Sequence, residues 1–66
     1  MQLVINGEKV QTEAGRVDTL LRERLGEVPA GTAVAVNGEV VPKSEWESTQ
    51  LEDGAQVDIL TAVQGG

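Results

Sequence analysis

The 66-residue sequence contains no cysteine, no histidine, no tyrosine and no phenylalanine. Without cysteine it can form neither a disulfide bond nor a thiolate metal site. Without histidine or cysteine the usual pairs of nucleophile and general base are missing, so no ordinary base activates the remaining hydroxyl groups. So short a chain also has little room for a concave substrate site. We therefore expect a protein that is not an enzyme.

Basic side chains are scarce as well, with five against eleven acidic ones and a net charge of −6. Nucleic-acid phosphates and acidic membrane surfaces would repel such a chain, which argues against both as partners. A protein with a basic docking face suits it better. Charge that merely keeps a small protein soluble is the alternative explanation. No segment has the pattern of a signal peptide or a membrane span, so a cytoplasmic location is the default expectation.

Metal binding also lacks a convincing pattern. The neighbouring carboxylates Glu52 and Asp53 precede Gly54, and such a sequence is typical of a solvated turn. We expect no metal site.

Two Asn-Gly pairs each follow a run of branched apolar residues, at positions 6–7 and 37–38. Asn-Gly supplies the two positive-φ positions of a tight turn between antiparallel strands. The sequence therefore predicts two β-hairpins, the first over residues 1–11 and the second over residues 32–41.

The alternation of side chains along a strand predicts which residues face the core. In the first hairpin we expect a core face of Met1, Leu3 and Ile5, with Val4 exposed on the opposite face. In the second hairpin Val34 and Val36 are expected in the core, and Ala33 and Ala35 outside. In a last strand over residues 56–61, Val57 and Ile59 should point inward, and Asp58 and Leu60 outward.

One helix is predicted between the two hairpins. Apolar residues fall on one helical face from residue 17 onward, at Val17, Leu20, Leu21 and Leu25. Gly26 is placed to close this helix in a left-handed cap. The preceding Gly15-Arg16 lacks the hydroxyl or acidic side chain that usually caps a helix start. After the second hairpin a short helical turn is expected to place Trp46 over the edge of the core, and packing is favoured over partner contact for this residue.

The element order predicts an α+β protein with the β-grasp, or ubiquitin-like, arrangement: a mixed sheet of about five strands with one helix packed across it. A right-handed crossover would make the first and last strands parallel neighbours at the centre. We expect residues 1–62 to form this domain and residues 63–66 a flexible C-terminal tail. Val4 and Leu60 would meet Ala33 or Ala35 on the uncovered face, as a docking patch or as scattered surface aliphatics.

The last residues, Gln64-Gly65-Gly66, place a terminal carboxylate after two residues without a Cβ. Such a segment adopts almost any φ and passes where side chains do not fit. The carboxylate could thus be delivered into another protein's active site. A frayed chain end is the alternative.

Four stretches together resemble the ThiS family of small sulfur carriers in thiamine biosynthesis: residues 36–42, 44–46, 51–54 and 57–66. The final Ala62-Val63-Gln64-Gly65-Gly66 is the most specific of them. Gly-Gly alone would equally fit ubiquitin or the small subunit of molybdopterin synthase. Gly15-Arg16 departs from the helix start that we expect, which affects the helix boundary and not the resemblance.

The resemblance implies a carrier cycle at the C-terminus. An E1-like adenylyltransferase of the ThiF type would use ATP and magnesium to adenylate the carboxylate of Gly66, and the chain itself would bind no cofactor. A sulfur donor protein would supply the sulfur of a thiocarboxylate, which a thiazole synthase of the ThiG type would consume. Gly65 would provide clearance, while four further residues would contact the partner. These are Gln64, Val63, Leu60 and Val4. The free carrier is expected to be a monomer.

Three other functions remain open from the sequence. A ubiquitin-like modifier joined through Gly66 to a lysine uses the same activation chemistry. A sulfur carrier could also serve another pathway, such as molybdopterin synthesis or tRNA thiolation. A β-grasp interaction domain with an inert tail is the third.

Overall fold

The computed structural model describes residues 1–61. The predicted order of elements is confirmed, and the chain runs through the following elements: β1 (Gln2–Ile5), β2 (Glu8–Gln11), α1 (Val17–Leu25), β3 (Ala33–Val36), β4 (Glu39–Val41), the 3₁₀ helix η1 (Lys43–Glu45) and β5 (Gln56–Leu60). The proposed tail, residues 63–66, lies outside the described residues.

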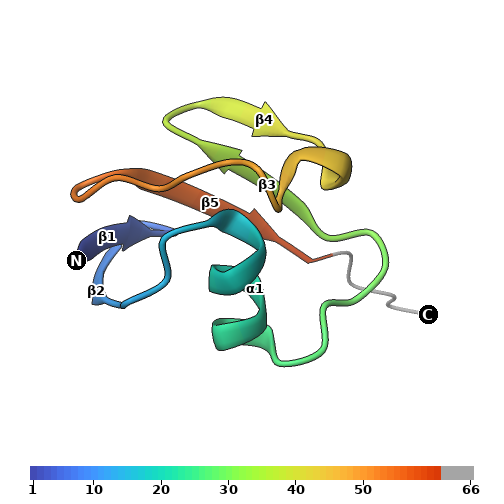
Figure 1. Cartoon of the computed structure of the whole chain (residues 1–66), viewed down its shortest axis with the longest axis horizontal. Coiled ribbons are helices and arrows are strands. Elements are labelled where there is room, and N and C mark those ends of the chain that lie inside the picture. Colours follow the sequence, from blue (N-terminus) through green and yellow to red (C-terminus); the bar gives the residue numbers. More distant parts are fainter. Residues whose placement is uncertain (62–66) are drawn as a thin grey trace.

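The five strands form one mixed sheet in the order β2-β1-β5-β3-β4. β1 and β5 are parallel neighbours, whereas β3 is antiparallel to both β4 and β5. Helix α1 crosses one face of this sheet (Figure 1). The predicted α+β architecture is therefore confirmed, with β5 in the central position.

Both Asn-Gly pairs form the predicted turns. Asn6 and Gly7 have φ values of 50° and 85°, and Asn37 and Gly38 have values of 51° and 85°. Positive φ at both central residues suits a two-residue hairpin, because it matches the twist of the strands. This local chemistry fixes the pairing of each hairpin, including Val4 with Lys9 and Ala35 with Val40.

The core lies between α1 and the sheet face that α1 covers. Its largest fully buried side chains are Leu3, Val17, Leu20, Leu21, Val34 and Val57. Burying one such side chain stabilises the fold by roughly 1.5–3 kcal/mol. The inward positions predicted for Val57 and Ile59 are confirmed. Val36 and Leu25 are only partly buried at the margin of this core.

The prediction that Met1 belongs to the core is wrong. Met1 is 42% exposed, and its ammonium group donates a hydrogen bond to the carbonyl oxygen of Thr12, at 2.8 Å. A charged chain end needs polar partners or water. The alternation of buried and exposed side chains along β1 therefore does not extend to Met1.

Helix α1 begins without a side-chain cap, since Arg16 occupies the cap position and makes no capping hydrogen bond. Backbone carbonyls replace the cap. The amides of Val17 and Asp18 donate to the carbonyl oxygens of Thr49 and Trp46, at 3.1 and 3.2 Å. These bonds satisfy two of the free N–H groups of the first turn, and they attach the segment after η1 to the helix.

At its other end α1 stops at Gly26, as predicted. The amide of Gly26 donates to the carbonyl of Arg22 at 2.8 Å. The predicted left-handed cap is wrong, because Gly26 has φ 71° and ψ −94°, so φ is positive but ψ lies outside the left-handed helical region. Without a Cβ, glycine populates such positive-φ conformations readily.

Trp46 follows η1 and is 7% exposed. Its indole Nε1 donates a hydrogen bond to the carbonyl oxygen of Val41, at 2.9 Å. The prediction that Trp46 packs at the edge of the core is confirmed.

Candidate functional site

Strand β5 is the last element of the chain and ends at Leu60, six residues before Gly66 in the sequence. Its pairing with β1 ends at Ile5 opposite Val57, whereas its pairing with β3 continues to Leu60 opposite Ala33. The last part of β5 therefore has a strand partner on only one side. Figure 1 shows β5 running between β1 and β3 in the sheet.

The sheet face that α1 does not cover carries an apolar patch beside this exit. Leu60 lies opposite Ala33, and Ala35 lies opposite Val40. Leu60 is 69% exposed and Val40 is 78% exposed. We call Ala33, Ala35, Val40 and Leu60 the open-face patch. Exposed apolar side chains gathered in this way are typical of a docking surface.

A shallow hollow of about 90 Å³ opens in the middle of this patch, and Val34 and Asp58 complete its lining. Asp58 lies opposite Ala35 on β3 and places one carboxylate beside the apolar side chains. A partner surface that fills the hollow would therefore combine a small apolar group with a nearby cation.

Val4 does not belong to the open-face patch, contrary to the expectation from the sequence. It is half-buried and lies opposite Gln56, four residues before Leu60. At about 3.3 Å per residue, this register separates Val4 from Leu60 by about 13 Å along the strand. The alternation placed Val4 on the correct face, but the position along the sheet depends on the register between β1 and β5.

The sequence analysis missed Val40, which is the most exposed large apolar side chain of the patch. A signal for it was present. A two-residue Asn-Gly loop sets Val36 opposite Glu39 and Ala35 opposite Val40. Because opposite residues share a face, Val40 could have been assigned to the same face as Ala35.

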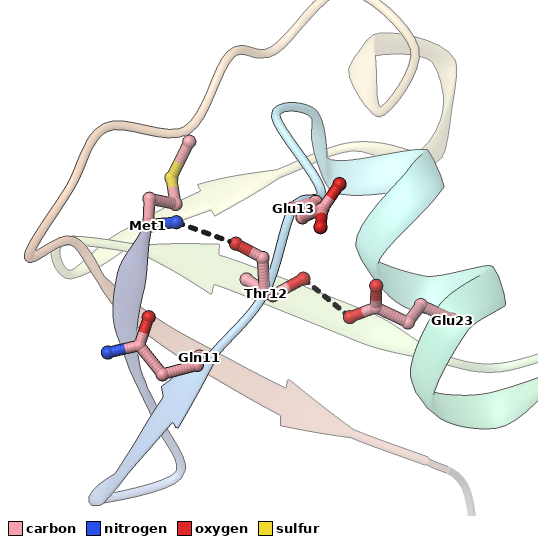
Figure 2. A pocket seen from close by; sticks show the side chains of 5 residues that line it. All are labelled: Met1, Gln11, Thr12, Glu13 and Glu23. Atoms are coloured by element: carbon pink, nitrogen blue, oxygen red, sulfur yellow. Dashed lines mark hydrogen bonds between the residues drawn. The ribbon is translucent and has the colours of Figure 1, made fainter.

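A second hollow, of about 580 Å³, lies at the opposite end of the sheet near Met1 (Figure 2). Its polar groups already bond to one another. The hydroxyl of Thr12 donates to Oε2 of Glu23 at 2.5 Å, and the amide of Ala14 donates to the same hydroxyl at 3.0 Å. Since β1 and β5 are parallel, this hollow lies away from the end of β5 where the tail leaves.

Within residues 1–61, no group of three potential metal ligands is close enough to hold an ion. Asp53, in the acidic turn, accepts a hydrogen bond from the amide of Gln2 at 2.7 Å and so fastens that turn to β1. In the same part of the chain, no helix has the length and apolar character needed to cross a membrane.

Of the six residues that the sequence predicts for the site, the structure describes Val4 and Leu60. The other four, Val63, Gln64, Gly65 and Gly66, lie outside the described residues. The described part of the site is thus the end of β5 with the open-face patch beside it.

Comparison with known proteins covers the chain through its last residues. The model of the ThiS family matches residues 2–66. The chain is 33% identical to the sulfur carrier protein ThiS of Escherichia coli (strain K12) over 66 residues, which span all of both chains. It is also 36% identical over 66 residues to a thiazole synthase of Paramagnetospirillum magneticum, and there it covers 20% of the longer protein.

Solved structures of one relative agree with the fold. The crystal structure of the thiamine biosynthesis protein ThiS from Geobacter metallireducens superposes with a TM-score of 0.78, at 28% identity and with full coverage of both chains. The solution structure of a thiamine biosynthesis protein from the same organism has the same TM-score and identity, with 88% of that chain covered. The β-grasp fold predicted from the sequence is confirmed.

Proposed function

Because the chain belongs to the ThiS family, we propose that it carries sulfur for thiamine biosynthesis as a thiocarboxylate on Gly66. The observation that carries this proposal is the extent of the family match, which runs through Gly65 to the terminal Gly66. The chain would act as a co-substrate of partner enzymes and would catalyse nothing itself.

The proposed chemistry starts from the terminal carboxylate. With a reference pKa of about 3.5, an α-carboxylate is ionised at neutral pH. It can therefore act as a nucleophile, but its carbonyl carbon is a poor electrophile. Its oxygen attacks the α-phosphorus of ATP in an E1-like enzyme of the ThiF type, and pyrophosphate leaves. The outer sulfur of a persulfide on a donor protein then attacks the carbonyl carbon, and AMP leaves. A thiol reductant cleaves the S–S bond of the resulting acyl disulfide with two electrons, so the former donor sulfur leaves in a disulfide with that thiol and the thiocarboxylate remains on Gly66.

Each terminal residue has a part in this proposal. Gly66 provides the reacting carbon, and Gly65 passes through a narrow channel because it has no Cβ. Gln64 and Val63 contact the channel entrance. The partner enzyme holds ATP and magnesium, and its closed site shields the acyl-adenylate from water. We propose a cytoplasmic location, the default expectation from the sequence.

The open-face patch is the proposed docking surface for the E1-like partner. Leu60 lies six residues before Gly66, so the patch and the reacting group sit at the two ends of one short segment. An extended chain rises about 3.3–3.6 Å per residue, which limits the distance between the docking surface and the partner's active site to about 20 Å.

The similarity to the thiazole synthase of Paramagnetospirillum magneticum supports the proposal of a second partner for this chain. That protein includes a segment that resembles this entire chain, and the segment makes up 20% of its length. A carrier-like segment within a synthase suggests that carrier and synthase work on a common substrate. We therefore propose that a thiazole synthase of the ThiG type receives the sulfur.

Intact-mass spectrometry tests the proposal. The protein is incubated with an E1-like enzyme, ATP, magnesium and a sulfur source. Replacement of one oxygen by sulfur supports the sulfur carrier, a larger covalent conjugate would indicate a protein modifier, and an unchanged mass would indicate an inert interaction domain. Thiazole formation on addition of the synthase separates thiamine biosynthesis from molybdopterin synthesis or tRNA thiolation.

A further inference from the structure

At the C-terminal end of β5, beyond the last residue of β1, the side chain of Asn6 forms the hydrogen bonds that a neighbouring strand would otherwise form. The pairing of β1 with β5 ends at Ile5 opposite Val57, and the amide of the next residue, Asn6, donates to the carbonyl of Val57 at 2.9 Å. The chain then turns away at Gly7, where φ is 85°. One further step along β5, the N–H and C=O of Ile59 face the position that a longer β1 would occupy.

The side-chain amide of Asn6 fills this position. Its Oδ1 accepts a hydrogen bond from the amide of Ile59 at 2.8 Å, and its Nδ2 donates to the carbonyl oxygen of Ile59 at 3.2 Å. A carboxamide has one acceptor and one donor side, so it pairs with a peptide as a neighbouring strand does. Asn6 thus extends the ladder on β5 by one step beyond the end of β1.

We infer that Asn6 is a positioning residue for the reactive C-terminus. By holding Ile59, it keeps the next residue, Leu60, in register opposite Ala33 within the open-face patch. It also fixes the point from which the remaining chain leaves the sheet. The inference rests on the proposed function, in which a partner recognises the patch and Gly66 together.

The physical reason is the cost of ordering a segment on binding. An interface that must also immobilise loose side chains and backbone loses affinity. If β5 separates from the sheet beyond Val57, Leu60 leaves the patch, and the partner must restore that contact when it binds. Asn6 orders this end of β5 in advance, so its loss should raise the KM for the carrier and leave kcat nearly unchanged.

The second hairpin supplies a matched control. Asn37 has nearly the same φ as Asn6, at 51°, and also precedes a glycine. Its Oδ1 accepts a hydrogen bond from the amide of Gln56 at 3.0 Å. Because β3 is antiparallel to β5, this bond lies at the start of β5, away from the tail. Asn37 therefore forms the same kind of turn as Asn6, but its side chain binds the start of β5 and cannot position the C-terminal end of that strand.

Glycine is the informative substitution at both positions. It tolerates positive φ without the steric cost of other residues, and Gly-Gly still suits the turn. Asn6→Gly and Asn37→Gly therefore each remove a side-chain hydrogen-bonding group without straining the backbone. Asn6→Asp and Asn37→Asp form a second pair, since Asp-Gly favours the same turn. At position 6 the carboxylate keeps the acceptor for Ile59 and loses the donor.

Amide hydrogen exchange measures the bonds directly in the free protein. In Asn6→Gly, exchange at Ile59 should accelerate about tenfold, the factor that loss of one typical hydrogen bond allows, while Gln56 is unaffected. In Asn37→Gly the pattern should reverse. Equal acceleration of exchange at Ile59 in both variants would contradict the claim that the Asn6 side chain specifically stabilises the end of β5. Tryptophan fluorescence of Trp46 verifies that each variant is folded.

Pyrophosphate release by the E1-like partner, measured against carrier concentration, tests the positioning role. We expect KM to rise about three- to tenfold for Asn6→Gly, as the cost of ordering one segment implies, and less than about twofold for Asn37→Gly. Should either glycine variant fail to fold, the aspartate pair is compared in the same way. A wild-type protein that supports no release would overturn the proposed function together with this inference. Normal release by the wild type with equal KM values for matched variants would overturn the inference alone.

Discussion

At the scale of single residues, Thr12 shows how one hydroxyl can join distant parts of a small fold. Thr12 is 6% exposed. It donates to Glu23 on α1 (Figure 2). It also accepts a hydrogen bond from the amide of Ala14. The hydroxyl therefore links the end of β2 to the helix. The sequence analysis assigned no role to Thr12, because nothing local indicates that Glu23 will face it.

We predict that Thr12→Val lowers the free energy of unfolding by about 1–2 kcal/mol, since the buried amide of Ala14 loses its acceptor. Urea denaturation followed by Trp46 fluorescence provides the measurement. Thr19→Val is the matched control, because Thr19 is exposed and its hydroxyl makes only a 3.4 Å contact with Asp18. Equal stability losses in the two variants would show that the Thr12 hydrogen bonds contribute little.

Gly26 is the residue at which backbone conformation decides the outcome of a substitution. Its φ is 71°, and a Cβ there would meet nothing within 4 Å. We predict that Gly26→Ala lowers the free energy of unfolding by about 1 kcal/mol or more, purely through positive φ. Gly15→Ala is the control, since the space around Gly15 is equally open and its φ is not in that region.

For this pair, thermal unfolding followed by circular dichroism is sufficient. Gly15→Ala should leave the midpoint unchanged or raise it slightly. A midpoint for Gly26→Ala equal to that of the wild type would mean that the helix end can adopt another conformation without cost.

At the scale of elements, the hairpins and the helix were predictable because their signals are local. The two Asn-Gly turns, the apolar face of α1 and the glycine that ends it all act within a few residues. The start of α1 was not predictable in this way. Its cap comes from the carbonyls of Trp46 and Thr49, which reach Val17 and Asp18 only once the chain has folded.

The open-face patch likewise depends on relations between elements. Leu60 and Ala33 were expected on one face from alternation alone, and the structure places them opposite each other. Val4 was placed beside them wrongly, because alternation says nothing about the register between β1 and β5. The sequence analysis did not assign Val40 to the open-face patch, although the two-residue Asn-Gly turn already determines which residue of β3 lies opposite Val40.

We predict that Val40→Ser and Leu60→Ser weaken docking without unfolding the protein. Both side chains are largely exposed, so the free energy of unfolding should change by less than about 0.5 kcal/mol. The KM for the carrier in pyrophosphate release should rise about tenfold, because a docking side chain at a well-packed contact contributes more than about 1 kcal/mol. Thr19→Ser, on the helix side, is the control, and an equal KM for all three variants would exclude the open-face patch as the docking surface.

At the scale of the whole molecule, the topology brings the first and last strands together at the centre of the sheet. The right-handed crossover rule was sufficient to predict this adjacency, and the observed order β2-β1-β5-β3-β4 confirms it. The central strand is therefore also the one that leads to Gly66. The residues that carry the proposed chemistry lie beyond Thr61, outside the described residues, so their roles stay predictions.

We predict that deletion of Gly66 leaves the fold intact and abolishes adenylation. The core residues of the described part of the chain lie between Leu3 and Ile59, so we expect the free energy of unfolding to equal that of the wild type. Pyrophosphate release should fall to the background rate, because the reacting carbon no longer reaches the nucleotide. Gly66→Ala should have the same effect through its added Cβ. Normal release by either variant would refute the role assigned to Gly66.

The most direct test of the central claim locates the sulfur atom in the product. After reaction with the E1-like enzyme, ATP, magnesium and a sulfur source, the protein is fragmented and analysed by tandem mass spectrometry. The account predicts that one sulfur replaces one oxygen and that only fragments containing Gly66 carry the mass change. Sulfur found on any other residue, or an unmodified Gly66 under conditions in which the enzyme consumes ATP, would contradict it.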